Sequence, residues 1–177
     1  WPETVDPEVN PELIAKTGVA GLDDILNGGL QRGRVYLVEG IPGSGKTTLA
    51  MQFLIEGAKR GETVLYITLS ETAEELNAVA RSHNWTLDGV TIRELLPDEN
   101  ALESEQQYTM FHPSVVDLAA TTEMIIDDVQ KLKPSRVVFD SLSELRLVAG
   151  NPLRYRRQIL ALKQYFAGRQ CTVSLLD

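Results

Sequence analysis

The stretch GIPGSGKTT, Gly40–Thr48, follows a short apolar run and precedes a segment with helical spacing, and it decides how the chain folds. Residues 40–47 match the pattern G-x-x-x-x-G-K-[ST] in full. The apolar run Val35–Val38 predicts a buried strand, and the spacing after the glycines predicts a helix over Thr47–Lys59. A strand, a glycine-rich turn and a helix in this order predict a loop whose backbone N–H groups hold phosphate.

Each type of residue in this loop has a role in binding a nucleotide. The glycines allow positive φ angles, so that the backbone can turn its N–H groups toward an anion. Lys46 supplies a cation for the β- and γ-phosphates, and the hydroxyl of Thr47 is a predicted Mg²⁺ ligand. The absence of an N-K-x-D stretch favours ATP over a guanine nucleotide. The predicted nucleotide-binding residues are Gly40, Pro42, Gly43, Ser44, Gly45, Lys46, Thr47 and Thr48.

A hydrated Mg²⁺ needs a second acidic residue, and the segment RVVFD, Arg136–Asp140, supplies a candidate. An apolar strand that ends in an acid is typical of the Walker-B strand of phosphate-loop proteins. We therefore predict that Asp140 is the second Mg²⁺ ligand and that its strand neighbours the strand of the phosphate loop. Many buried strands also end in Asp as a turn or cap residue, so this alternative stays open.

Strands and helices alternate along the rest of the chain, which predicts right-handed βαβ units and a largely parallel sheet with helices on both faces. Residues 1–15 hold three prolines and are predicted to be an extended arm or linker, which leaves residues 16–177 as the domain. The other predicted strands are Thr63–Ser70, a short strand from Thr91, Arg136–Asp140 and the final residues CTVSLLD. The other predicted helices run from the N-cap Thr72 to about His83, from Pro113 to before Pro134, and from Pro152 to about Ala167.

Composition limits the classes of function. The chain has 177 residues and a formal net charge of −8, which argues against a broad basic face that binds nucleic acid. No apolar stretch approaches the roughly 20 residues that a membrane-spanning helix needs. Cys171 is the only cysteine in the sequence, so no internal disulfide forms, and a reducing compartment, the cytoplasm, is predicted.

Four segments together resemble the RecA-superfamily ATPases of the KaiC type. They are TGVAGLDDILNGGLQRG before the first strand, EGIPGSGKTTLAMQFL, VLYITLSET and KPSRVVFDSLSEL. The resemblance covers Lys16–Asp177 and implies a RecA-like P-loop NTPase core that assembles as a hexameric ring with ATP at its subunit interfaces. It also implies that the domain continues beyond Asp177. The segment in which clock members autophosphorylate would lie there, so no autokinase site is assigned.

Hydrolysis needs a carboxylate that orients or deprotonates the attacking water. KaiC-type members usually carry two consecutive glutamates at the end of the strand beside the phosphate-loop strand, whereas this chain has Ser70 and then Glu71. Three interpretations compete. Glu71 is the base, shifted by one position; or hydrolysis is slow and the protein is a scaffold held by nucleotide; or Glu71 only favours the N-terminus of the next helix. We predict the first, with Lys46 and Glu71 as the catalytic residues.

These observations predict Mg²⁺-dependent binding and slow hydrolysis of ATP by a KaiC-like oligomer with a signalling or clock-type role and signalling proteins as partners. Two alternatives stay open. A RecA-type DNA recombination or repair ATPase, or an accessory paralogue of one, would share every nucleotide residue named above, and the acidic charge argues against it. A non-hydrolysing ATP-binding scaffold is supported by Ser70 in the place of a carboxylate.

Overall fold

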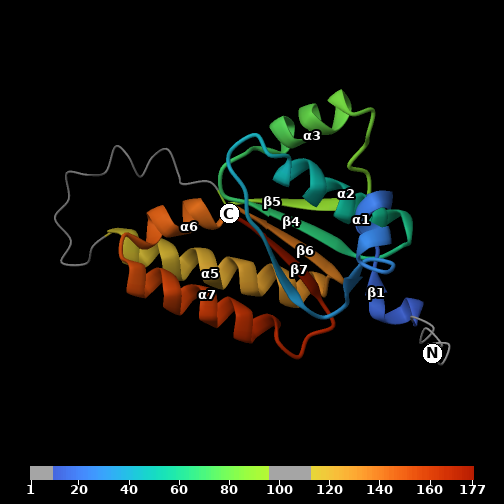
Figure 1. Ribbon diagram of the computed structural model, residues 1–177. Helices are drawn as coiled ribbons and strands as arrows, with labels where there is room; N and C mark the ends of the chain where they lie inside the picture. The colour runs from blue at the N-terminus through green and yellow to red at the C-terminus, as the bar shows by residue number, and fades with distance from the viewer. Residues whose placement is uncertain (1–9, 96–112) are drawn as a thin grey trace.

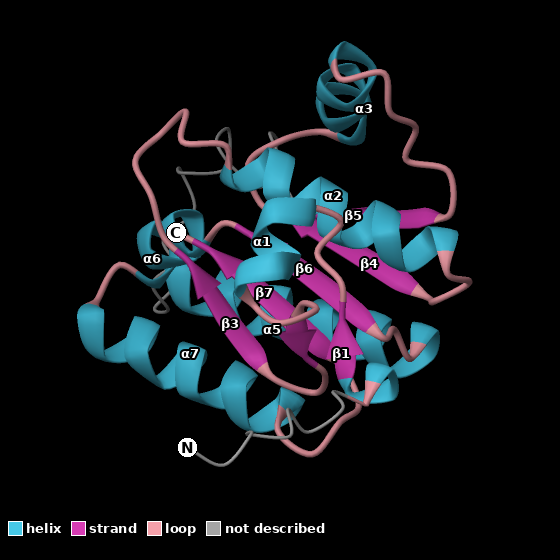
Figure 2. Cartoon of the chain, turned by 45° about the vertical axis from the view of Figure 1, so that its right-hand side comes forward, coloured by secondary structure: helices cyan, strands magenta, loops and turns pink. Residues whose placement is uncertain are grey.

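The computed structural model describes residues 10–95 and 113–177, and its centre is a five-stranded sheet. Every neighbouring pair of strands is parallel. Figure 2 shows two strands, β3 and β5, at the edges of the sheet. In the order of the sheet the strands are β3 (Val35–Val38), β7 (Thr172–Leu176), β6 (Arg136–Asp140), β4 (Val64–Thr68) and β5 (Val90–Glu94).

Helices cover both faces of this sheet (Figure 1). One face carries α2 (Lys46–Lys59) and α3 (Ala73–Ser82), and the other carries α5 (Pro113–Leu132), α6 (Leu142–Ala149) and α7 (Pro152–Phe166). The predicted α/β class, with a parallel sheet between two helical layers, is confirmed. Within residues 10–95 and 113–177, no helix is both long and apolar enough to cross a membrane.

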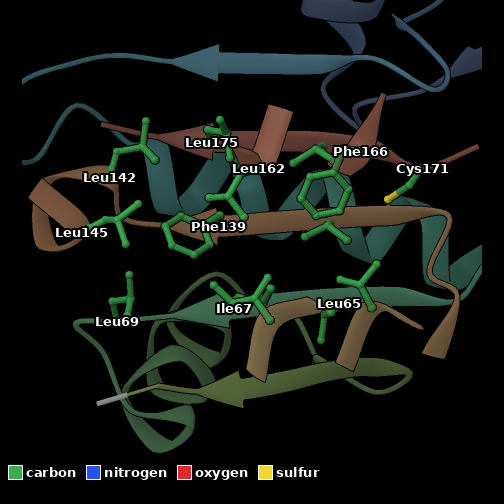
Figure 3. Packing of buried hydrophobic residues seen from close by; sticks show 14 of the residues in the cluster. Leu65, Ile67, Leu69, Phe139, Leu142, Leu145, Leu162, Phe166, Cys171 and Leu175 are labelled. Carbon is green, nitrogen blue, oxygen red and sulfur yellow. The ribbon is translucent and has the colours of Figure 1, made fainter. Parts of the chain in front are cut away.

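A hydrophobic core joins the sheet to the layer of α5, α6 and α7. Phe139 and Ile67 of the sheet belong to the same buried cluster as Leu162 and Phe166 of α7 (Figure 3). Cys171 lies in this cluster too, and burial raises the pKa of its thiol to about 12. The thiol is therefore a protonated, packed side chain at neutral pH.

The order of the strands corrects one prediction that bears on the site. Asp140 and Glu71 were expected to follow strands beside the phosphate-loop strand, but β7 lies between β3 and β6, and β4 is one strand further away. Every residue of β7 is buried, which suits an interior strand paired on both sides. The start of α2 still reaches Asp140, because α2 leaves the edge strand β3 and crosses the sheet to pack on β4 and β6.

The segment before the sheet contains elements that the sequence patterns do not predict. Ala15, expected in the arm, is fully buried in the core beneath α2, because its strand pairs with a second short strand. Residues 1–9 of the predicted arm lie outside the described residues. The elements of this segment are η1 (Pro11–Leu13), β1 (Ile14–Ala15), α1 (Ala20–Ile25) and β2 (Leu30–Gln31).

The helix α6 is also absent from the sequence-based assignment, although its sequence carries two helical signals. Leu142, Leu145 and Ala149 are spaced for one face of a helix, and all three are buried in the same cluster as Phe139. Figure 3 labels the first two. Gly150 follows the helix with a φ of +60°, the left-handed conformation that often ends helices. The helix is short because Pro152 begins α7 two residues later.

A buried ion-pair network ties β6 to α2 and to the N-terminal segment. Arg136, the first residue of β6, is fully buried, and its guanidinium donates to both carboxylate oxygens of Glu62 at 2.7 and 2.9 Å. The same guanidinium donates to the carbonyl oxygens of Lys16, at 2.6 Å, and Phe53, at 2.8 Å. Arg32 donates to the Glu62 carboxylate as well, at 2.7 and 3.1 Å. Two cations therefore share one carboxylate at the end of the sheet opposite the phosphate loop.

We expect this network to make the free energy of unfolding fall in acid. Burial raises the pKa of Glu62, but the hydrogen bonds and charges of Arg136 and Arg32 outweigh burial and lower it from 4.5 to about 2. The contribution of Glu62 is therefore complete above about pH 4.5 and is lost as the pH falls toward 2. Denaturant titrations at about pH 6 and about pH 3 should differ by about 1 to 2 kcal/mol from this group, allowing for its remaining exposure.

Two substitutions test the assignment of this acid dependence. In Glu62→Gln, the part of the change in the free energy of unfolding between the two pH values that comes from this carboxylate should disappear. Glu56→Gln, which breaks the more exposed pair between Glu56 and Arg60 at 2.7 Å, should leave it in place. An acid dependence that persists in full in Glu62→Gln would contradict the role of this carboxylate.

Candidate functional site

The loop between β3 and α2 has the geometry of an anion-binding turn. Gly45, immediately before α2, has a φ of +89°, in the left-handed region that favours glycine. At Gly40 a Cβ atom would lie 2.5 Å from Oγ of Ser44, so a larger residue would displace that side chain. The turn places the N-terminus of α2 at the surface, where backbone N–H groups and the helix dipole favour an anion.

Two side chains at the start of α2 extend from this turn. The ammonium group of Lys46 donates to the carbonyl oxygen of Gly40 and, at 3.2 Å, to that of Ile41, so it lies against its own loop. The hydroxyl of Thr47 instead donates to Oδ2 of Asp140 at 3.2 Å. Among the other predicted loop residues, Pro42, Gly43, Ser44 and Gly45 are exposed, whereas Gly40 and Thr48 are half-buried.

Asp140 ends β6 and is held from two sides. Its Oδ2 accepts the hydrogen bond from Thr47 and a second one, at 2.6 Å, from the phenol of Tyr66. Its carbonyl oxygen accepts from the N–H of Leu69 at 2.7 Å, which joins the ends of β6 and β4. The Asp140 side chain is buried, with 7% of its surface exposed. The two predicted Mg²⁺ ligands, Thr47 and Asp140, therefore lie side by side, although 93 positions separate them in the chain.

Glu71 follows β4, and the side chain of Thr68 sets its position. Thr68 Oγ1 accepts from the N–H of Glu71 at 2.9 Å and donates to its carbonyl oxygen at 2.8 Å. In the part of the chain that the structure describes, Oε2 of Glu71 is buried and has no hydrogen-bond partner. Burial and the charges of Asp140 and Glu75 raise the pKa of Glu71 above its ordinary value. A carboxylate in these surroundings is suited to accept a proton.

The N-terminus of α3 has its own acidic residue, which bears on the weakest interpretation of Glu71. Thr72 caps this helix by accepting from the N–H of Glu75 at 3.2 Å, and Glu75 accepts in return from the N–H of Thr72 at 2.8 Å. The capping box predicted around Thr72 is thus confirmed. Since Glu75 caps the N-terminus of α3, stabilising that helix end does not explain why Glu71 has a buried carboxylate oxygen. Ser70, where the resemblance implies another carboxylate, is exposed.

Tyr66 is a site residue that the sequence patterns do not indicate. It lies in the middle of β4 with 1% of its surface exposed, and its sequence context VLYIT resembles that of any apolar core strand. Burial and the neighbouring charge of Asp140 raise the pKa of its phenol, so the group remains a hydrogen-bond donor at neutral pH. A hydroxyl within an otherwise buried apolar strand was the available signal, because buried phenols need a hydrogen-bond partner.

This chain is similar to a family of ATPases, which agrees with the phosphate loop described above. A family model described as "ATPase: KaiC" matches residues 15–176. A UPF0273 protein of Pyrococcus horikoshii is 30% identical over 162 residues, which are 89% of this chain and 65% of that protein. The circadian clock oscillator protein KaiC of Parathermosynechococcus lividus is 36% identical over 131 residues, 73% of this chain and 24% of that protein. The circadian clock protein KaiC3 of Synechocystis is 31% identical over 152 residues, 80% and 28% of the two chains.

The matches cover most of this chain but only part of each relative. The chain spans 65% of the length of the UPF0273 relative and smaller shares of the two clock proteins. The family model covers all five strands of the central sheet, the phosphate loop and the two candidate carboxylates, Glu71 and Asp140. The parallel sheet between two helical layers agrees with a RecA-like P-loop core. With nearly the whole chain matched by the family model, this protein belongs to the KaiC-like ATPase family.

Proposed function

We propose that this chain binds ATP together with Mg²⁺ at the loop formed by residues 40–47 and hydrolyses it slowly. The observation that carries the proposal is the hydrogen bond between the Thr47 hydroxyl and the Asp140 carboxylate at the start of α2. The carboxylate of Glu71, which has an oxygen without a partner among the described residues and a pKa that burial and the charge of Asp140 raise, supports it. The description of the matching family as an ATPase supports the same activity.

The donors around the loop fit a nucleoside triphosphate with its metal. Backbone N–H groups at the start of α2 would hold the β- and γ-phosphates, and Lys46 would exchange the carbonyl oxygens of Gly40 and Ile41 for phosphate oxygens. Thr47 and Asp140 offer the hard oxygen ligands that Mg²⁺ prefers. When bound, the metal neutralises charge on the phosphates.

Glu71 is the proposed base for the attacking water. The water oxygen would form a bond to the γ-phosphorus as the bond to the bridging oxygen breaks, and the water proton would pass to the Glu71 carboxylate. Oε2 of Glu71 has no competing hydrogen bond within the described residues, and the raised pKa favours proton acceptance. Ser70 cannot take this role near neutral pH without another base.

A second candidate function, an ATP-binding scaffold that does not turn over, is favoured by Ser70. Ser70 stands where the resemblance implies the first of two glutamates, so part of the usual acidic pair is missing. A scaffold would still respond to nucleotide, because a ligand shifts a conformational equilibrium whenever it binds the two states unequally. Tight ATP binding without phosphate release in the intact protein would establish this function in place of hydrolysis.

The assembly and the role of the intact protein are proposed from the family resemblance. We propose that the intact protein forms a hexameric ring, which is what the resemblance to KaiC-type ATPases implies. The names of two relatives, which are circadian clock proteins, support a signalling or clock-type role. Light scattering of the intact protein with and without ATP and Mg²⁺ tests the ring. A monomer under both conditions would contradict it.

Lys46→Ala tests the nucleotide site itself, and we expect ATP to bind at least about 100-fold more weakly in this variant. The ammonium group is the cation at the loop, and its loss leaves phosphate charge uncompensated. Isothermal titration of the intact protein with ATP and Mg²⁺ measures the change. Lys59→Ala is the matched control, because Lys59 is exposed at the far end of the same helix. Equal affinity in Lys46→Ala and the parent would refute the site.

A further inference from the structure

We infer that Tyr66 is a positioning residue for the metal site, acting through the carboxylate of Asp140. The inference rests on the proposed function, because it concerns how the proposed Mg²⁺ ligand is held. The phenol of Tyr66 donates to Oδ2 of Asp140 at 2.6 Å. The two residues come from adjacent strands, β4 and β6, and are 74 positions apart in the chain.

Two hydroxyl groups converge on the same oxygen of Asp140. Thr47 donates to Oδ2 at 3.2 Å from the half-buried start of α2, whereas Tyr66 donates at 2.6 Å from inside the core. Once Thr47 turns to a metal ion, Tyr66 remains as the partner of Oδ2. Both hydrogen bonds are to Oδ2, so these two groups leave the other carboxylate oxygen, Oδ1, for another ligand.

The position of Tyr66 makes its hydroxyl a rigid donor. In the pairing of β4 with β6, Tyr66 is opposite Val138 and Thr68 is opposite Asp140, so the phenol reaches along the neighbouring strand to the acid at its end. The Tyr66 ring is packed in the core beneath α2 with Met51 and is 1% exposed. A side chain held in this way cannot follow the carboxylate if it rotates, so it restricts Asp140 to one orientation.

Restricting a metal-binding carboxylate has a measurable consequence. Groups that hydrogen-bond to metal ligands orient them, and removing such a group typically costs about 10- to 100-fold in metal affinity. Tyr66→Phe keeps the ring and its packing and removes only the hydroxyl. We therefore expect the variant to retain ATP binding without metal and to require more Mg²⁺.

The test is a Mg²⁺ titration of phosphate release and of ATP binding in the intact protein. In Tyr66→Phe the Mg²⁺ concentration for half-maximal effect should rise by about tenfold, and excess Mg²⁺ should restore the parental rate of phosphate release. Recovery by metal separates positioning from general damage to the fold, which Mg²⁺ would not repair. Tyr36→Phe is the matched control, since the Tyr36 hydroxyl donates to the carbonyl oxygen of Gln31 at 3.0 Å, away from the acid.

A second variant pair tests the route through Asp140. Adding Tyr66→Phe to Asp140→Asn should leave the Mg²⁺ dependence of ATP binding unchanged, and a further loss would overturn the inference. Repeating the comparison with Tyr66→Met, which also lacks the hydroxyl, gives a second result if Tyr66→Phe does not fold. A parental Mg²⁺ dependence in folded Tyr66→Phe would also overturn it while leaving the proposed function intact. Absence of ATP binding in the parent would overturn both together.

Discussion

Glu71→Gln should lower the rate of phosphate release by about 1,000-fold and leave ATP binding within about twofold of the parent. Glutamine has the same shape as glutamate but cannot accept the proton of the attacking water. Thr68 holds the backbone of this turn, at 2.8 and 2.9 Å from its carbonyl and N–H groups, so the substitution should not move the chain. Steady-state phosphate release and isothermal titration of the intact protein measure the two quantities.

The pH dependence of phosphate release should carry the signature of the same residue. Glu71 must be ionised to act as a base, and burial and the charge of Asp140 raise its pKa above the ordinary value of 4.5. The rate of the parent should therefore fall as the pH drops through that raised pKa, at a higher pH than an ordinary glutamate would produce. This limb of the profile should be absent in Glu71→Gln.

Glu74→Gln is the matched control, because Glu74 is exposed in the first turn of α3, three residues after Glu71. It should leave phosphate release unchanged. Parental rates in Glu71→Gln would refute Glu71 as the base and direct the search to a carboxylate of a neighbouring subunit. Tight ATP binding with no release in either protein would favour the scaffold function.

Arg136→Met should lower the free energy of unfolding by about 4 kcal/mol, a large part of the about 5 to 15 kcal/mol typical of a domain. The substitution leaves Glu62 with one cation instead of two and removes the donor from the carbonyl oxygens of Lys16 and Phe53. Gly57 of α2 leaves room for this side chain, because a Cβ atom there would lie 2.7 Å from Cδ of Arg136. Chemical denaturation at neutral pH measures the loss.

Two further variants separate charge from geometry in this network. Arg136→Lys keeps the charge but cannot make the paired hydrogen bonds to Glu62, so it should lose an intermediate amount of stability. Arg60→Gln removes only the pair with Glu56 on the exposed side of α2 and should cost less than about 1 kcal/mol. A loss below about 1 kcal/mol in Arg136→Met would show that the network does not stabilise the fold.

Features that depend on neighbours along the chain could be predicted from the sequence. The phosphate loop rests on a short pattern of glycines followed by Lys46 and Thr47, and β3 and β6 have the predicted bounds. The prediction that β3 is buried was wrong, because it is a partly exposed edge strand. The cap of α3 joins Thr72 to Glu75, which are only three residues apart. The α/β class follows from the alternation of such elements. Local sequence determines these features because each depends on backbone conformation or hydrogen bonds within a few residues.

Only the tertiary structure decided which distant groups meet. The insertion of β7 between β3 and β6 places Asp140 beneath the start of α2, so the expected neighbouring strands were wrong while Asp140 still lies beside Thr47. The bonds from Tyr66 to Asp140 and from Arg136 to Glu62 each join residues 74 positions apart. No local pattern marks such contacts, because strand order and the packing of the core bring them together, and a buried hydroxyl or guanidinium takes its partner from whatever the fold places beside it.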